Sequence, residues 1–198
     1  MEIGLNGSFF LAVAGHQDGP GPAPAKGGAD TSLVDALRKG DEGAFERLYA
    51  RYAPMVHGLL LARVPRDEVD DLVQDVFFTA LRKLDALRES AAFGGWLATI
   101  ARNRAMDFHR TREETVDLSD EVIESKAAPR TEDDGEAARA LEAIRSLPEA
   151  YRETLILRLV EGMTGPEIAD RTGLTPASVR VNLHRGMKML REKLGAGN

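Results

Sequence analysis

Six residues near the end of the chain have side chains suited to reading DNA. The segment 175–194, TPASVRVNLHRGMKMLREKL, starts with a capping threonine before Pro176, at the one helical position where proline is well tolerated. On the helix that this start predicts, cationic and small side chains share an arc opposite the apolar residues. Guanidinium groups can bind phosphate or guanine, and the β-branched Val181 can contact a thymine methyl. The candidate DNA-contacting residues are Ala177, Arg180, Val181, His184, Arg185 and Lys188.

A second set of residues is typical of a protein-interface anchor. Helical spacing over 67–84 places an aromatic ring among carboxylates on the face opposite the predicted core, at Asp71, Gln74, Asp75, Phe78 and Arg82. A large apolar side chain ringed by polar ones is suited to docking another protein. Two alternatives are that Phe78 packs inside its own domain, or that the carboxylates bind a metal. The metal site is disfavoured because no histidine or cysteine stands beside them.

A third set mixes cations with an amide, as phosphate contact and base-edge hydrogen bonding require. The helix predicted over 93–112 has an exposed arc that carries Thr99, Arg102, Asn103, Met106 and Arg110. Arg104 falls inside the apolar arc, where it is expected to extend to solvent or pair with Asp107. Trp96 is either a platform on which an unstacked base rests or a core residue.

Helices account for the positions of all three sets. Helical periodicity and caps predict helices over 31–39, 41–60, 67–84, 93–112, 136–146 and 148–161. A short helix opened by Pro166 and a turn at Gly173 then lead into the helix from Thr175. This last pair has the layout of a helix-turn-helix, whose second helix enters the major groove; the alternative is an ordinary helical hairpin. No alternating strand pattern is present, so the sequence predicts an all-α fold.

Composition limits the possible functions. The 198 residues include no cysteine, which excludes disulfides, cysteine-ligated zinc and thiol catalysis. No apolar run approaches the length of about 20 residues that a membrane span needs, so no direct membrane insertion is expected. The four histidines are scattered and no phosphate-binding loop is present, so neither an enzyme nor a cofactor is expected.

Charge and composition predict how the chain is divided. Residues 1–30 form a Gly/Pro/Ala-rich flexible tail in which Phe9 to Leu11 is either a short anchor, part of a disordered tail or a product of a misassigned start codon. Residues 113–136 contain ten acidic and two basic residues, which indicates an acidic flexible linker. Two small helical domains, 31–112 and 137–198, remain on either side of it. The net charge of −6 is therefore concentrated in the linker, and the flanking segments 88–112 and 137–198 are basic.

Four motifs in this order resemble the extracytoplasmic-function sigma factors, which belong to the sigma-70 family of bacterial RNA polymerase. AFERLYARYAPMVHGLL resembles the first helix of their promoter-melting domain (region 2), and DEVDDLVQDVFFTALRKL their polymerase-binding helix. FGGWLATIARNRAMDFHR is similar to the strand-opening helix that reads the −10 element. LPEAYRETLILRLVEGMTGPEIADRTGLTPASVRVNLHRG is similar to the helix-turn-helix domain that reads the −35 element (region 4).

The resemblance implies a role for each candidate set. The first helical domain would bind core polymerase through the Phe78 set, which would dock on the clamp helices of the largest subunit; the flap is a second expected contact. Asp107 would join Trp96, Arg102, Asn103, Met106 and Arg110 at the −10 element, and the Val181 set would contact the −35 element. An anti-sigma partner is also implied, often one anchored in the membrane, with the chain itself in the cytoplasm.

Some residues depart from the family pattern. Val181 and Asn182 replace small polar and basic residues, and Gly94-Gly95 replace bulkier residues before Trp96. The promoter sequence therefore does not carry over from the family. A stand-alone helix-turn-helix repressor or activator is the main alternative function; it should dimerise on a palindrome, but no dimerisation surface is evident in the sequence.

Overall fold

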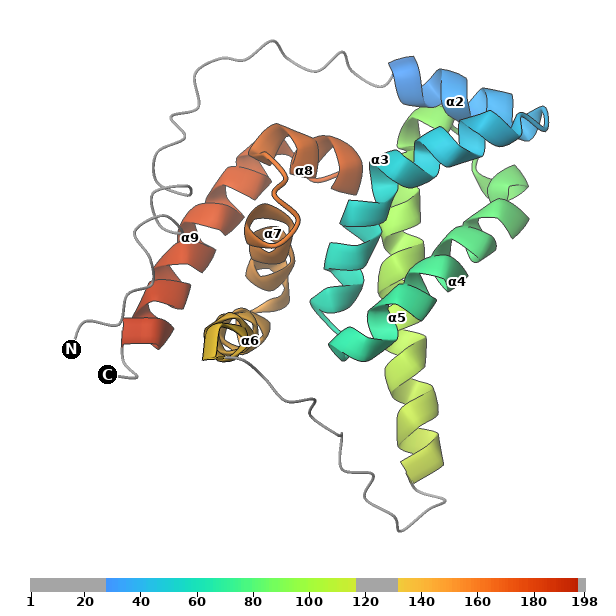
Figure 1. Ribbon diagram of the computed structural model, residues 1–198. Coiled ribbons are helices and arrows are strands. Elements are labelled where there is room, and N and C mark those ends of the chain that lie inside the picture. The colour runs from blue at the N-terminus through green and yellow to red at the C-terminus, as the bar shows by residue number, and fades with distance from the viewer. Residues whose placement is uncertain (1–27, 117–131, 196–198) are drawn as a thin grey trace.

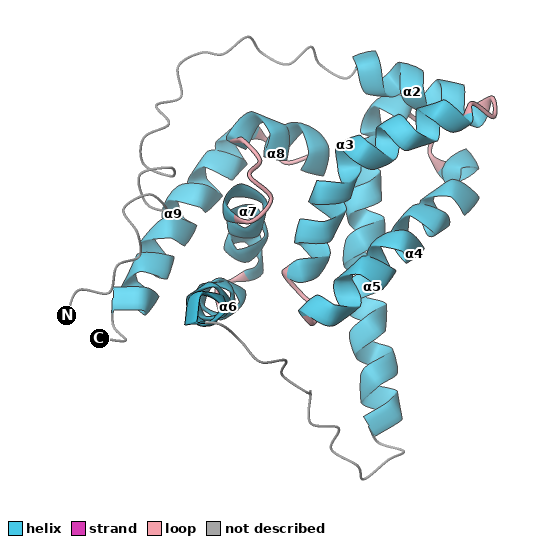
Figure 2. Ribbon diagram, in the orientation of Figure 1, coloured by secondary structure: helices cyan, strands magenta, loops and turns pink. Residues whose placement is uncertain are grey.

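The computed structural model describes residues 28–116 and 132–195, with side chains described over 30–112 and 137–195. All the regular structure within these ranges is helical (Figure 2). The helices form an N-terminal group, α2 to α5, and a C-terminal group, α6 to α9 (Figure 1). This confirms the predicted all-α fold class. The N-terminal anchor Phe9 to Leu11 and most of the predicted linker lie outside the described residues.

The N-terminal group has four α-helices: α2 (Gly28–Arg38), α3 (Glu42–Leu61), α4 (Val69–Arg82) and α5 (Phe93–Val116). Three short 3-10 helices, Arg66–Glu68, Leu84–Ala86 and Ser90–Ala92, lie between them. Asp41 begins α3 as predicted, since its carboxylate accepts a hydrogen bond from the Ala44 amide at 3.2 Å. Apolar side chains from α3, α4 and α5 fill the core, among them Leu48, Met55, Leu59, Val76 and Leu97.

The first helix starts earlier than the sequence indicated. α2 begins at Gly28, and its Asp30 is buried, where it accepts a hydrogen bond from the Tyr52 hydroxyl at 2.8 Å and pairs with Arg51 at 3.0 Å. These partners lie about twenty residues away, so local composition did not reveal them. Residues 28–30, predicted to belong to the tail, are therefore part of the N-terminal group.

The C-terminal group contains α6 (Glu132–Arg145), α7 (Glu149–Leu159), α8 (Gly165–Thr172) and α9 (Pro176–Gly195). Thr164 and Glu167 form a reciprocal capping box at the start of α8. Gly173 ends α8 with a φ of 76°, a conformation that favours glycine. Thr175 then accepts a hydrogen bond from the Ser178 amide at 3.1 Å. The predicted helix-turn-helix is confirmed.

The two groups pack against each other. α3 and α5 contact α7 and α8, an arrangement that we call the closed arrangement (Figure 1). Glycines allow the close approach: a Cβ on Gly94 would lie 2.5 Å from the Arg171 carbonyl oxygen, and one on Gly58 would lie 2.8 Å from Leu157. Arg145 adds polar contacts, since its guanidinium donates to the carbonyls of Leu61 and Val64. Periodicity predicted the two helical groups but not this contact between them.

Candidate nucleic-acid and protein interfaces

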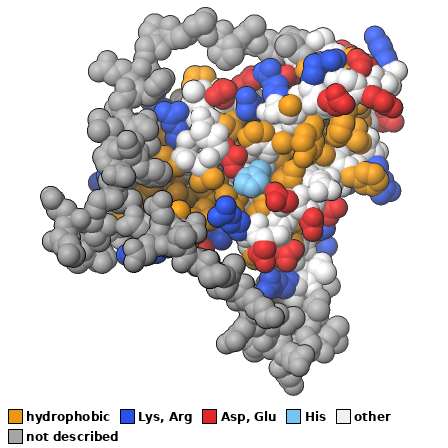
Figure 3. Space-filling view, in the orientation of Figure 1, with side chains coloured by type: hydrophobic (Ala, Val, Ile, Leu, Met, Phe, Trp, Pro, Cys, Tyr) orange, Lys and Arg blue, Asp and Glu red, His pale blue; other side chains and the backbone are white. Residues whose placement is uncertain are grey.

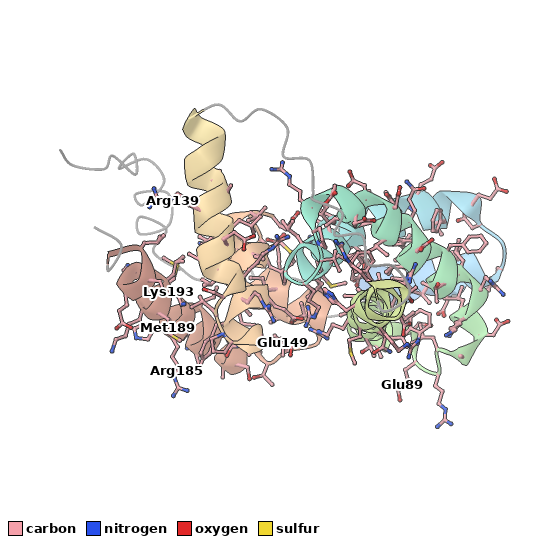
Figure 4. The ribbon with its side chains drawn as sticks, turned by 90° about the horizontal axis from the view of Figure 1, so that it is seen from below. Glu89, Arg139, Glu149, Arg185, Met189 and Lys193 are labelled. Carbon is pink, nitrogen blue, oxygen red and sulfur yellow. The ribbon has the colours of Figure 1, made fainter. Side chains whose placement is uncertain are left out.

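The outer face of α9 is open to solvent. Its exposed residues include every member of the predicted DNA-contacting set, Ala177, Arg180, Val181, His184, Arg185 and Lys188. The opposite face packs on α7, where a Cβ on Gly186 would lie 3.1 Å from Leu155. Within residues 30–112 and 137–195, no ion pair engages the three cations of the set, and Arg185 projects away from the helix (Figure 4). The face is available to phosphates, and DNA contact by these residues stays a prediction.

The start of α8 holds this face in a fixed position. The Thr164 amide and hydroxyl both donate to the Glu167 carboxylate, at 2.9 and 2.8 Å. The hydrogen bond from the Thr164 amide is the main cause that lowers the pKa of Glu167, and the hydroxyl bond adds to it, so the capping carboxylate is charged at neutral pH. Ile168 is buried behind it. The α8–α9 turn therefore presents the α9 face on a rigid support.

The outer face of α4 carries the predicted interface anchor. Asp71, Gln74, Asp75, Phe78 and Arg82 are all exposed, and Phe78 keeps 62% of its surface in contact with solvent. The Arg82 guanidinium lies 5.9 Å from the centre of the Phe78 ring. Hydrophobic side chains gather on the α3–α4 side of the molecule, with acidic side chains beside them (Figure 3). The alternative that Phe78 packs inside its own domain does not hold for the described residues.

Arg104 pairs with a different residue from the one expected. Its guanidinium donates to the Asp75 carboxylate at 2.7 and 3.2 Å, whereas Asp107 pairs with Arg110 at 3.0 Å. The packing of α4 against α5 brings Asp75 within reach, and sequence spacing alone could not show this. Arg104 thereby fixes Asp75 beside Phe78 on the predicted interface.

The outer face of α5 is only partly exposed. Asn103, Met106 and Arg110 are exposed, and Met106 keeps 66% of its surface in solvent. Asp107 is half-buried. Trp96 packs partly buried against the core, with its ring centre 6.0 Å from that of Phe93. A stacking role for Trp96 therefore has support only from its partial exposure.

Arg102 was predicted to be free for DNA, and in this structure it is not. Its Nε and Nη2 donate to the two carboxylate oxygens of Glu153 on α7, at 2.9 and 3.0 Å. The hydrogen bond to Glu153 is the main cause that raises the pKa of Arg102, so the guanidinium stays charged. The helical arc of α5 was predicted correctly, but the second domain covers this end of it.

Arg63 and two glutamates extend this contact. The Arg63 side chain, which is 9% exposed, lies in the turn that follows α3 and pairs with both Glu149 and Glu153. The hydrogen bond from Arg63 is the main cause that lowers the pKa of Glu149, which lies on the side of the C-terminal group that faces α5 (Figure 4). We call Arg63, Arg102, Glu149 and Glu153 the interdomain charge cluster. Sequence reasoning missed it; the local signal was a glutamate at position 153 close before the apolar residues 155–157, which the structure buries.

His57 and Glu161 form a second polar contact between the domains. The His57 Nδ1 lies 2.6 Å from the Glu161 carboxylate, which hydrogen-bonds the ring and raises the pKa of His57 above 6.5. Asp70 also raises this pKa, and burial and Arg66 lower it. Because the raised pKa belongs to the closed arrangement, its stabilisation is fully present below pH 6.5 and is lost as the pH rises through the raised pKa.

We therefore expect the closed arrangement to weaken as the pH rises above about 6.5. Thermal unfolding and the distance between the domains, each measured below and above about pH 6.5, should show the loss of stability of the closed arrangement. A His57→Gln variant should lack most of this pH dependence. An unchanged pH profile in the variant would contradict the assignment to His57.

Two family models match the chain. The model for sigma-70 region 2 matches residues 48–115, and the model for sigma-70 region 4 matches residues 137–190. Among curated relatives, RNA polymerase sigma factor CarQ of Myxococcus xanthus is 35% identical over 167 residues, which cover 82% of this chain and 95% of CarQ. The ECF RNA polymerase sigma-E factor of Escherichia coli K12 is 32% identical over 179 residues, which cover 83% of this chain and 94% of that protein.

Two solved structures share the fold. CnrH in complex with the cytosolic domain of CnrY has a TM-score of 0.60 and 27% identity, over 86% of this chain and 99% of CnrH. The sigma factor RpoE of Bartonella quintana, in complex with the anti-sigma factor NepR, has a TM-score of 0.54 and 25% identity, over 78% and 98%. The chain belongs to the extracytoplasmic-function group of the sigma-70 family.

This family has no catalytic chemistry of its own, and the chain is a transcription initiation factor rather than an enzyme. In the described part of the chain, no group of three or more histidine, cysteine or carboxylate residues could hold a metal ion. Likewise, none of the described helices is both long and apolar enough to span the bilayer.

Proposed function

We propose that this RNA polymerase sigma factor docks on core polymerase through α4, reads the −35 element with α9 and opens the −10 element along α5. The single observation that carries this proposal is that three separate outer faces, each of the required chemistry, are exposed on one chain. Phe78 lies among carboxylates on α4, cations line α9, and Asn103 and Met106 face solvent on α5.

Promoter binding requires the two domains to separate. The −10 and −35 elements lie about 25 base pairs apart, which is about 85 Å of duplex. Residues 117–131 join α5 to α6 and can span roughly 50 Å when fully extended. Two weak DNA contacts joined in this way reinforce each other through effective concentration. The acidic linker either lowers the affinity of the free chain for DNA, occupies a basic polymerase channel or acts as a solubilising spacer.

We further propose that an anti-sigma protein holds the chain inactive until a signal releases it. The solved relative RpoE was captured with the anti-sigma factor NepR, and CnrH was captured with the cytosolic domain of CnrY. The proposed location is the cytoplasm, with retention at the inner membrane if the anti-sigma protein is anchored there. Core polymerase and promoter DNA are the other two partners.

In vitro transcription tests the function. Core polymerase is incubated with fragments of the source genome, with and without the full chain, and the transcript starts are mapped. New starts that depend on the chain support the proposal. A chain that binds a palindrome without polymerase and creates no new starts would instead be a stand-alone helix-turn-helix regulator.

Val181 should set part of the −35 preference. Its side chain keeps 44% of its surface exposed at the centre of the cationic α9 face, where it can meet a thymine methyl. Val181→Ala removes two methyl groups, and the expected loss of discrimination at one base pair is about fivefold, or about 1 kcal/mol. A binding-selection assay with the polymerase-bound chain measures this. Val160→Ala, the same change at another exposed valine of the domain, should leave the preference unchanged.

A further inference from the structure

Two guanidinium groups converge on one buried carboxylate at the domain interface. Arg102 binds Glu153 through two hydrogen bonds of 2.9 and 3.0 Å, and Arg63 pairs with the same carboxylate. Glu153 is only 6% exposed. A fork of donors around a single carboxylate is the geometry of an anion-binding site.

The cations and the carboxylates of this cluster come from different domains. Arg63 and Arg102 belong to the N-terminal domain, and Glu149 and Glu153 belong to α7. Among residues 30–112, no carboxylate pairs with either arginine; within its own domain the Arg63 guanidinium donates to the Leu59 carbonyl of α3, at 3.0 Å. When the domains separate for promoter binding, two neighbouring cations lose their counter-charges, and a replacement anion becomes favourable.

The position of Arg102 indicates which anion replaces Glu153. Arg102 stands one and two helical turns before Met106 and Arg110, on the same side of α5, and next to Asn103. This is the face proposed to follow the −10 element. A guanidinium fork binds phosphate as well as carboxylate, and a DNA strand along this face carries a phosphate at every nucleotide.

We propose that Arg63 and Arg102 form an anion site that holds the Glu153 carboxylate in the closed arrangement and a DNA backbone phosphate after the domains separate. Glu153 and the phosphate then exclude each other, so the C-terminal domain competes with DNA for the N-terminal domain. This inference rests on the proposed function and adds Arg63 and an internal competitor to it. The free chain remains a weak DNA binder until the cluster is broken.

The test measures DNA affinity of the full chain without polymerase. Fluorescence anisotropy follows binding to a labelled single-stranded oligonucleotide and to its duplex, over a range of salt concentrations. Glu153→Gln keeps the side-chain shape and removes the competing charge, so we expect roughly fivefold to tenfold tighter binding. Glu142→Gln is the matched control, because it removes the same charge from an exposed residue that pairs with Arg145 in its own domain. Equal affinities for Glu153→Gln and Glu142→Gln would overturn the proposal.

The arginines are tested in the Glu153→Gln background. Adding Arg102→Ala or Arg63→Ala should cancel the gain and reduce the salt slope by about one phosphate contact. Arg47→Ala, which removes an exposed cation paired with Asp41 elsewhere in the N-terminal domain, should leave most of the gain. A gain that survives the loss of Arg102 and Arg63 would overturn the proposal.

Arg102→Ala alone separates the proposed role from a structural one and does not depend on the folding of Glu153→Gln. It breaks the same interdomain contact, so a purely structural arginine predicts DNA binding at least as tight as that of Glu153→Gln. If Arg102 instead binds a DNA phosphate, Arg102→Ala should show no such gain in DNA affinity. The probe contains no promoter and the assay contains no polymerase. If the chain directs transcription initiation but does not show the expected DNA affinities in this assay, only the anion site is rejected and the proposed function stands.

Discussion

Phe78→Ala should weaken binding to core polymerase by about 30-fold or more, the loss of about 2 kcal/mol that defines an interface hot spot. Phe78 is the most exposed aromatic residue that the structure describes, and Asp75 beside it is held in place by Arg104. Burying this ring in a partner removes a large apolar surface from water. Titration of fluorescently labelled chain with core polymerase measures the change.

Met106→Ala is the matched control for Phe78→Ala. Met106 is equally exposed on the same domain, but on the α5 face. Met106→Ala should retain polymerase affinity and weaken strand opening, and Phe78→Ala should retain the binding of free DNA. Polymerase affinity that is unchanged in Phe78→Ala would remove α4 from the polymerase contact.

Gly94→Ala should open the closed arrangement. The added Cβ would lie 2.5 Å from the Arg171 carbonyl oxygen and 3.1 Å from the Tyr52 ring, and the carbonyl belongs to backbone that cannot rotate away. Overpacking of this kind costs about 1–3 kcal/mol, so the ratio of closed to open chains should fall about fivefold or more. The chain has no cysteine, so cysteines introduced at exposed Lys39 and Lys193 can carry a dye pair that reports the distance between the domains.

Gly165→Ala is the control for Gly94→Ala. Its added Cβ would meet only Val179, at 3.9 Å, which is an ordinary contact distance. Energy transfer between the dyes should fall in Gly94→Ala and stay unchanged in Gly165→Ala. Equal energy transfer in Gly94→Ala and the unmodified sequence would mean that the interface adapts to the extra methyl group.

Local patterns in the sequence predicted the helices and their faces. Thr175, Gly173 and Asp41 fix helix ends through contacts with near neighbours in the chain, so their roles were visible without a structure. The exposure of the Phe78 and Val181 faces follows from helical periodicity in the same way.

Contacts between distant segments were not visible in the sequence. Arg102 meets Glu153 fifty-one residues later, and Arg104 meets Asp75 twenty-nine residues earlier. Helical spacing predicts which way a side chain points, but not which element covers it. Gly94 is visible in the sequence as a departure from the family pattern, but only the close approach of Arg171 supplies its physical reason.

Arg145 holds the closed arrangement through main-chain acceptors of the N-terminal group. Arg145 donates to the Leu61 and Val64 carbonyls, with distances of 2.7 to 3.0 Å. These acceptors are main-chain atoms, so divergence of the α3 side chains does not delete them. A single codon change at position 145 does remove the donor, and it leaves the α4, α5 and α9 faces untouched. The strength of the contact between the two groups can therefore change independently of the residues on those faces.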